Sequence, residues 1–208
     1  MKAIIVCGSP QLWLPDDLAG YIVGVDRGAI ALIERNIAFD VAVGDFDSVS
    51  EIELERIRAK AGVVLELPEN KDMTDCEAAT QHVMEKGYRD IYLYGAMGGR
   101  FDHQFAVIGL MLKYAKQDGA ICLIDEQNSV FILVAGVHCI EFDRSKKYIS
   151  FFALESTVKN LTLGNVEYSL RGYDLTVDDS LCVSNKPLGT SIDVSFDEGY
   201  LLVVQSSD

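Results

Sequence analysis

The stretch Val41-Ala-Val-Gly-Asp-Phe-Asp-Ser-Val-Ser-Glu-Ile-Glu53 contains the features that decide the fold of this chain. It begins with a continuously hydrophobic run over residues 41–43, which is typical of a buried parallel strand. A polar turn with two aspartates follows. Ser50 and Glu53 then fit a capping box, which predicts a helix that continues to about Lys60. A strand, an acidic turn and a helix in immediate succession indicate an α/β sheet.

The rest of the first 125 residues repeats this alternation. Further hydrophobic runs predict strands at residues 3–7, 21–25, 63–67, 91–94 and 121–124. A second capping box, from Thr74 to Glu77, predicts a helix to about Lys86. Hydrophobic residues spaced by three and four predict the buried face of a third, longer helix. That face comprises Phe101, Phe105, Ile108, Leu112 and Ala115. We therefore expect residues 1–126 to form an α/β domain with a mainly parallel, doubly wound sheet.

The pattern changes after residue 127. Hydrophobic runs predict short strands at residues 130–134, 138–142, 148–153, 158–163, 181–184, 191–196 and 200–204. Turn residues, including several glycines, separate these runs, and no helical pattern appears. Closely spaced strands with turns between them are typical of sandwiches and barrels. We expect residues 127–208 to form an all-β domain of the sandwich or jelly-roll type.

Composition excludes several classes of partner. The chain has 208 residues and a net charge of −14, with 18 basic against 32 acidic side chains. Nucleic acids and anionic membranes favour basic surfaces, so we expect neither as a partner. We see no hydrophobic run of transmembrane length and no secretion signal. The five cysteines lack metal-binding spacing, which is typical of reduced thiols and favours a cytoplasmic location.

Acidic residues are concentrated in two short loops, 44–48 and 71–75, and a third loop, 95–103, adds Arg100 and Asp102. The carboxyl ends of strands in an open α/β sheet share one edge, so these loops are expected to converge. Carboxylates that are brought together repel one another unless a cation neutralises them, and their oxygens suit Mg²⁺. Thr74 and Asp75 also begin a predicted helix, whose N-terminus favours phosphate. The loops therefore predict a site for Mg²⁺ and a nucleotide.

Each motif also has a purely structural interpretation. Asp-Ser and Thr-Asp pairs are common in turns and helix caps, and Arg100 could form a surface ion pair. His103, near a helix start, could be a polar neighbour of the cap. The loop at residues 7–10 could equally be a simple turn or a phosphate loop. The specificity of the prediction comes from the combination of motifs.

In their order along the chain, the motifs resemble those of the thiamine pyrophosphokinase family, and the resemblance covers nearly the whole sequence. The shared patterns are Val25-Asp-Arg-Gly-Ala29, Gly44-Asp-Phe-Asp-Ser48, Lys71-Asp-Met-Thr-Asp75 and Gly98-Gly-Arg-Phe-Asp-His103. In the β region, residues 158–170 and Val183-Ser-Asn185 resemble the family's thiamine-binding domain. The resemblance implies transfer of a diphosphoryl group from ATP to the hydroxyl of thiamine, giving thiamine diphosphate and AMP. It also implies Mg²⁺, with Mn²⁺ as an alternative, and a homodimer with shared active sites.

The resemblance assigns roles to the residues that match these motifs. The metal is expected at Asp45, Asp47, Asp72 and Asp75. ATP is expected at Asp26, Arg27, Gly28, Asp45, Asp47, Ser48, Thr74, Gly98 and Arg100. Thiamine is expected at Asp102, His103, Ser184 and Asn185. Catalytic roles fall to Lys71, Arg100 and Asp102, of which Asp102 either accepts the proton of the thiamine hydroxyl or orients Arg100.

Two positions depart from the family's pattern, and two other functions fit part of the sequence. Val107 stands where the family commonly has asparagine, and Lys186-Pro187 stands where an aromatic residue often follows the Ser-Asn pair. How the thiamine rings are held therefore stays open. The α/β loops also suit diphosphoryl transfer to another hydroxymethyl compound, such as a pterin, which the β region argues against. A non-catalytic sensor of thiamine diphosphate or a nucleotide would not need the retained acids and Arg100.

Overall fold

Six parallel strands lie side by side in the first part of residues 2–208, the range that the computed structural model describes. The chain divides after Glu126 into two compact units. The strand order in the first unit is β6 (Ala120–Ile124), β5 (Asp90–Tyr94), β1 (Lys2–Val6), β2 (Tyr21–Val25), β3 (Val41–Gly44) and β4 (Val63–Glu66). Neighbouring strands are all parallel. The chain runs from β1 toward β4 on one side and continues from β5 to β6 on the other, which confirms the doubly wound sheet.

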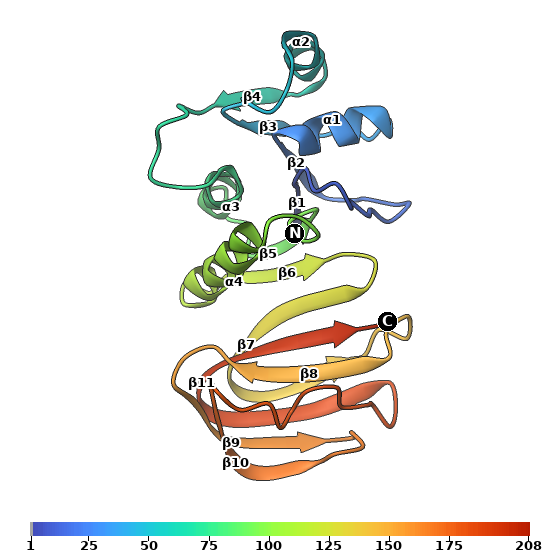
Figure 1. Ribbon diagram of the computed structural model, residues 1–208, viewed down its shortest axis with the longest axis vertical. Coiled ribbons are helices and arrows are strands. Elements are labelled where there is room, and N and C mark those ends of the chain that lie inside the picture. Colours follow the sequence, from blue (N-terminus) through green and yellow to red (C-terminus); the bar gives the residue numbers. More distant parts are fainter. Residues whose placement is uncertain (1) are drawn as a thin grey trace. The chain divides into compact units, whose positions relative to one another are not determined.

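Helices cover both faces of this sheet. They are α1 (Arg27–Glu34), α2 (Glu51–Lys60), α3 (Asp75–Glu85) and α4 (Phe101–Ala115). Ile30 of α1 and Ile57 of α2 pack in one buried cluster with Ile4 and Ile22 of the sheet. Figure 1 shows α1 on the opposite side of the strands from α3 and α4. No helix within residues 2–208 combines the length and the hydrophobicity needed to cross a membrane.

Side-chain caps fix where α2 and α3 begin. Ser50 Oγ accepts a hydrogen bond from the Glu53 N–H at 3.3 Å, and Glu53 Oε2 accepts one from the Ser50 N–H at 2.8 Å. The predicted capping box is therefore confirmed. Thr74 Oγ1 accepts a hydrogen bond from the Glu77 N–H at 3.2 Å. Because Thr74 caps α3, Asp75 becomes the first residue of that helix.

The buried face of α4 differs from the predicted one. Phe101 and Phe105 are 78% and 70% exposed, and their ring centroids lie 6.2 Å apart. The residues of α4 that are buried are Val107, Leu110, Met111 and Tyr114. The helix is hydrophobic around much of its circumference, so spacing alone does not tell which stripe packs against the sheet. The prediction of a buried Phe101 and Phe105 is wrong.

Antiparallel strands make up the second unit, which confirms the predicted all-β class. β11 (Ser191–Ser206) pairs with β7 (Asn128–Glu141) along almost its whole length. The first part of β11 also pairs with β9 (Thr157–Gly164), and the second part pairs with β8 (Tyr148–Ala153). β10 (Leu170–Thr176) pairs with β9. A separate hydrophobic core fills this unit and includes Phe151, Leu161 and Phe196.

Strand boundaries in the second unit differ from the prediction in three ways. Residues 130–134 and 138–141 belong to one strand that continues through Gly136 and ends before Phe142. Residues 191–196 and 200–204 likewise belong to one strand, whose register shifts between Phe196 and Tyr200. Residues 181–184 form a turn instead of a strand, and β10 lies where no strand was predicted. Glycines at a bulge or bend do not end a strand, so their use as boundaries was misleading here.

Candidate active site

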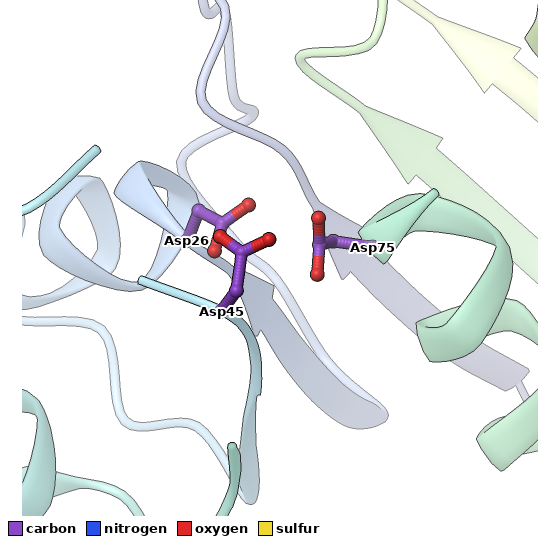
Figure 2. A group of neighbouring side chains, drawn as sticks. All are labelled: Asp26, Asp45 and Asp75. Atoms are coloured by element: carbon purple, nitrogen blue, oxygen red, sulfur yellow. The ribbon is translucent and has the colours of Figure 1, made fainter. Parts of the chain in front are cut away.

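Three carboxylates meet at the carboxyl edge of the parallel sheet. Asp26 follows β2, Asp45 follows β3, and Asp75 begins α3. One oxygen from each lies within 4.8 Å of the others. Figure 2 shows the three carboxyl groups facing one another from these three separate elements. The sheet topology therefore brings together residues that are far apart in the sequence, as expected at this edge of an open α/β sheet.

The backbone around Asp26 allows its carboxylate to lie against the loop that follows β3. Asp26 has φ 46° and ψ −119°, a conformation that non-glycine residues rarely adopt and that the surrounding structure must stabilise. Its Oδ1 accepts a hydrogen bond from the Phe46 N–H at 3.2 Å. A Cβ atom at Gly44 would overlap that same carboxylate oxygen. The glycine of the Gly44–Ser48 motif thus makes room for Asp26.

Lys71 bridges the other two carboxylates. Its Nζ lies 2.7 Å from Asp45 Oδ2 and 3.0 Å from Asp75 Oδ1. The hydrogen bond from Lys71 holds the pKa of Asp45 below its usual value. Burial lowers the pKa of Lys71, but its hydrogen bond to Asp45 and its ion pair with Asp75 outweigh burial and raise it. The ion pair of Lys71 with Asp45 therefore favours the charged form of both groups.

Asp26 has no such partner. Burial, followed by the negative charge of Asp75, raises the pKa of Asp26 to about 7, although the Phe46 N–H lowers it. A raised carboxyl pKa in a cluster of acids means that the charged form lacks compensation. When all three groups are ionised, three negative charges face the one ammonium of Lys71, which leaves two negative charges uncompensated.

Two observations test whether these residues fit a divalent cation. Asp75 Oδ1 is the one buried side-chain polar atom within residues 2–208 that receives no hydrogen bond, although Lys71 Nζ lies 3.0 Å away in an ion pair. Such an atom needs a partner, and a cation can be one. The donor set is also entirely carboxylate oxygen, which suits Mg²⁺ or Mn²⁺. The residues present therefore fit a hard divalent cation.

A cavity of about 650 Å³ opens beside the carboxylates. The loop after β1 (residues 7–10), the loop after β5 and the first turn of α3 form its walls, together with one side of α4. The order of strands reverses between β1 and β5, which is where ligands bind in open α/β sheets. The volume suits a small molecule of nucleotide size.

The structure divides the predicted site residues into two sets. Those in the cavity wall are Asp26, Arg27, Ser48, Thr74, Asp75, Arg100 and His103. Of the other acids, Asp47 and Asp72 are exposed and lie outside the carboxylate group. Asp47 donates its N–H to Asp45 Oδ1 at 3.2 Å and so helps to orient Asp45. The third carboxylate of the group is Asp26, which was predicted as a nucleotide contact.

Two predicted glycines lie near the cavity without lining it. Gly28 packs directly against the Val6 carbonyl, and a Cβ atom there would overlap it. Gly98 has φ 83°, a left-handed conformation that favours glycine, and its neighbour Gly99 reaches the cavity wall. Both glycines therefore shape the backbone around the site.

Arg100 and Asp102 form an exposed ion pair at the rim. The guanidinium donates to both carboxylate oxygens of Asp102, at 3.1 and 2.5 Å. Asp102 also accepts a hydrogen bond from the His103 N–H at 3.0 Å. The Arg100 hydrogen bond, together with that of His103, lowers the pKa of Asp102. These contacts favour a role for Asp102 in orienting Arg100 over a role as proton acceptor.

Ser184 and Asn185 lie in the second unit and differ in accessibility. Asn185 is 3% exposed. Its Oδ1 accepts hydrogen bonds from the N–H groups of Tyr168 and Lys186, and its Nδ2 donates to the Tyr168 carbonyl. Ser184 is exposed in a left-handed conformation with φ 57°. Asn185 thus holds together the loops around it, and Ser184 is the residue of the pair that a ligand can reach.

Three groups of the cavity wall were not assigned to the site from the sequence. Residues 7–10, Glu77 and Lys113 all line it. The loop at residues 7–10 directly follows a strand, a signal that the sequence offers but that simple turns share. Lys113 Nζ lies 2.7 Å from Glu77 Oε1 and links α4 to α3 across the cavity. No local motif marks this pair, because its two members come from different helices.

Replacing Asp26 with asparagine is expected to change how stability depends on pH. A folded-state pKa of about 7, above that of the unfolded chain, favours folding at low pH, and this contribution is lost as pH rises through 7. Asp26→Asn removes the dependence. In the absence of metal, the unfolding free energy of the Asp26→Asn variant should rise relative to that of the parent by about 1–2 kcal/mol as pH increases from about 4 to about 8. Urea unfolding in EDTA measures this, with exposed Asp47→Asn as the control. If the unfolding free energies of Asp26→Asn and the parent changed with pH in the same way, this prediction would be refuted.

An open parallel sheet with a carboxylate group and a cavity at its switch point, followed by an antiparallel β unit, is typical of α/β proteins that bind a ligand at the carboxyl ends of their strands. Two family descriptions match in chain order. They are "Thiamin pyrophosphokinase, catalytic domain" over residues 12–123 and "Thiamin pyrophosphokinase, vitamin B1 binding domain" over residues 137–201. The chain belongs to the thiamine pyrophosphokinase family.

Individual relatives agree with this membership. The chain is 36% identical to thiamine pyrophosphokinase of Bacillus subtilis (strain 168) over the full length of both. The crystal structure of thiamine pyrophosphokinase from Bacillus subtilis matches with a TM-score of 0.92 at 35% identity, covering all of both chains. That of a thiamin pyrophosphokinase family protein from Enterococcus faecalis matches with a TM-score of 0.93 at 31% identity, again over both whole chains. The resemblance proposed from the motifs is confirmed.

Proposed function

We propose that this protein transfers a diphosphoryl group from ATP to the hydroxyl of thiamine, with Mg²⁺ as cofactor, and releases thiamine diphosphate and AMP. Family membership supports the class of reaction, which is pyrophosphoryl transfer to form thiamine diphosphate. The observation that carries the finer proposal is the carboxylate group, with its buried, unbonded Asp75 Oδ1, beside a cavity that begins at the N-terminus of α3. Mn²⁺ is compatible with the same oxygen donors.

The reaction requires positioning and charge neutralisation more than covalent chemistry. The thiamine oxygen forms a bond to the β-phosphorus of ATP, the bond between that phosphorus and the α–β bridging oxygen breaks, and AMP leaves. Asp26, Asp45 and Asp75 would hold the metal, which supplies positive charge to the phosphate oxygens. Thr74 and Asp75 place the positive end of the α3 dipole at the cavity. Arg27 and Arg100 add two guanidinium groups in its wall.

Incubation with ATP, Mg²⁺ and thiamine tests this function. We expect thiamine diphosphate and AMP in equal amounts, with no product after EDTA treatment and recovery when Mg²⁺ is restored. A diphosphorylated pterin formed in place of thiamine diphosphate would identify another acceptor. Binding of thiamine diphosphate without any turnover would identify a sensor. Either result would refute the proposal.

We further propose that the active site is shared across a homodimer. Every residue that lines the cavity lies between Cys7 and Lys113, whereas Ser184 and Asn185 belong to the other compact unit. From the family resemblance, we propose that the β domain of one subunit lies over the cavity of its partner. A two-fold dimer would then contain two equivalent composite sites.

Where the homodimers of two variants, one changed in each domain, are both inactive, their mixed dimers are expected to recover activity. In a mixed dimer of Asp45→Ala and Asn185→Ala, one site carries both changes and the other carries neither. Random exchange should restore about a quarter of the parent activity. The measurement is turnover after the two variants are refolded together, with mixed dimers verified by subunit tags. No recovery in verified mixed dimers would mean that each site is built within one chain.

A further inference from the structure

The ammonium of Lys71 lies among the three carboxylates of the candidate site. Besides its contacts with Asp45 and Asp75, at 2.7 and 3.0 Å, its ammonium lies 3.3 Å from the carbonyl oxygen of Pro68. The Lys71 side chain is only 12% exposed. Two of the three carboxylates that would hold the metal are therefore engaged by a cation that belongs to the chain itself.

An ammonium group and a divalent cation exclude each other from these oxygens. Mg²⁺ takes its oxygen ligands at about 2.1 Å, so a metal ion that shares Asp45 Oδ2 or Asp75 Oδ1 with the ammonium would lie within about 5 Å of Lys71 Nζ. Repulsion between the two positive charges at such a distance is strong in a partly buried site. Metal entry consequently requires the ammonium to leave.

We propose that Lys71 is a placeholder counter-ion, which neutralises Asp45 and Asp75 in the metal-free protein and moves to a nucleotide phosphate when the metal binds. This inference rests on the proposed function, because it takes a phosphorylated nucleotide as the ligand. Lysine is suited to the exchange, since its ammonium is a compact charge on a flexible four-carbon stem.

The position of Lys71 brings a phosphate within reach. Lys71 precedes Thr74, the cap of α3, by three residues, and Thr74 and Asp75 both line the cavity. A helix N-terminus favours phosphate at this point. The ammonium would therefore leave the carboxylates of Asp45 and Asp75 and bind a phosphate oxygen at the same end of α3. Metal and nucleotide would then assist each other's binding, since each stabilises the arrangement that the other needs.

Lys71→Met should change two binding constants in opposite directions. Without the competing ammonium, free Mn²⁺ should bind the metal-free protein about tenfold more tightly. The complex of Mn²⁺ with α,β-methylene-ATP should bind about tenfold more weakly, because the contact between ammonium and phosphate is lost. Electron paramagnetic resonance of free Mn²⁺ measures the first constant, and calorimetric titration at saturating Mn²⁺ measures the second. A merely structural role for Lys71 would weaken both.

Two further variants separate charge from packing. Lys113→Met removes a positive charge from the same cavity wall, where Lys113 pairs with Glu77, and should leave free Mn²⁺ affinity within about twofold of the parent. Lys71→Arg keeps the competing charge and should retain weak Mn²⁺ binding. Unchanged or weaker Mn²⁺ binding by Lys71→Met would overturn the proposal, as would unchanged binding of the manganese–nucleotide complex. Failure to form thiamine diphosphate would instead refute the proposed function, which these binding measurements do not test.

Discussion

Asp45→Asn and Asp75→Asn should each lower kcat/KM for thiamine diphosphate formation by about 10²–10³-fold or more while leaving the fold intact. Each substitution removes a charged oxygen from the group of three carboxylates that lie within 4.8 Å of one another. Asparagine has nearly the same size and shape, so packing is preserved. The measurement is turnover at saturating Mg²⁺, with circular dichroism as the check of folding.

Asp47→Asn is the matched comparison, because the two lines of reasoning disagree about it. The sequence motif makes Asp47 a metal ligand, whereas the structure leaves its carboxylate exposed and outside the group. From the geometry we expect Asp47→Asn to cost less than about tenfold in kcat/KM. A loss equal to that of Asp45→Asn would return Asp47 to the metal site. Near-normal activity of Asp45→Asn would remove that residue instead.

Gly28→Ala should have the largest effect on stability. A Cβ atom at Gly28 would overlap the carbonyl oxygen of Val6, and that atom belongs to the backbone of β1. The sheet cannot move aside as a flexible side chain could, so the start of α1 must shift. Overpacking costs about 1–3 kcal/mol even where side chains can adjust, and we expect at least about 3 kcal/mol here. Urea unfolding of the metal-free protein measures this difference.

Gly109→Ala provides the control for that substitution. Gly109 lies within α4, and a Cβ atom there would meet nothing within 4 Å. Alanine favours a helix interior over glycine, so Gly109→Ala should raise the unfolding free energy by about 0.5–1 kcal/mol. Equal stability of the Gly28→Ala variant and the parent would show that α1 is not packed against β1 in the way described.

Local chemistry in the sequence was sufficient for the parts of the fold that depend on near neighbours. The strand at residues 41–43 and the Ser50–Glu53 capping box were both predicted, and both need only residues within a few positions. The buried face of α4 was not, because Phe101 and Phe105 have the right spacing but lie on the stripe that the sheet leaves uncovered. Which stripe is buried depends on tertiary packing.

The candidate site shows the same division. Asp45 and Asp75 stand in acidic motifs and were selected from the sequence as metal ligands. Asp26 was placed only near the nucleotide, because its proximity to them depends on the pairing of β2 with β3 and on the close approach allowed by Gly44. Asn185 was selected as a ligand contact, but its buried side chain makes three hydrogen bonds to the backbone of its own domain. A two-residue motif does not predict whether its asparagine side chain is buried.

ATP labelled at its β-phosphorus tests the central claim most directly. The account predicts that the label passes to thiamine as part of a diphosphoryl group and that unlabelled AMP is released with it in equal amount. Attack at the β-phosphorus leaves no other distribution. Label retained in ADP, accompanied by thiamine monophosphate, would show that only the terminal phosphoryl group moves and would contradict the account.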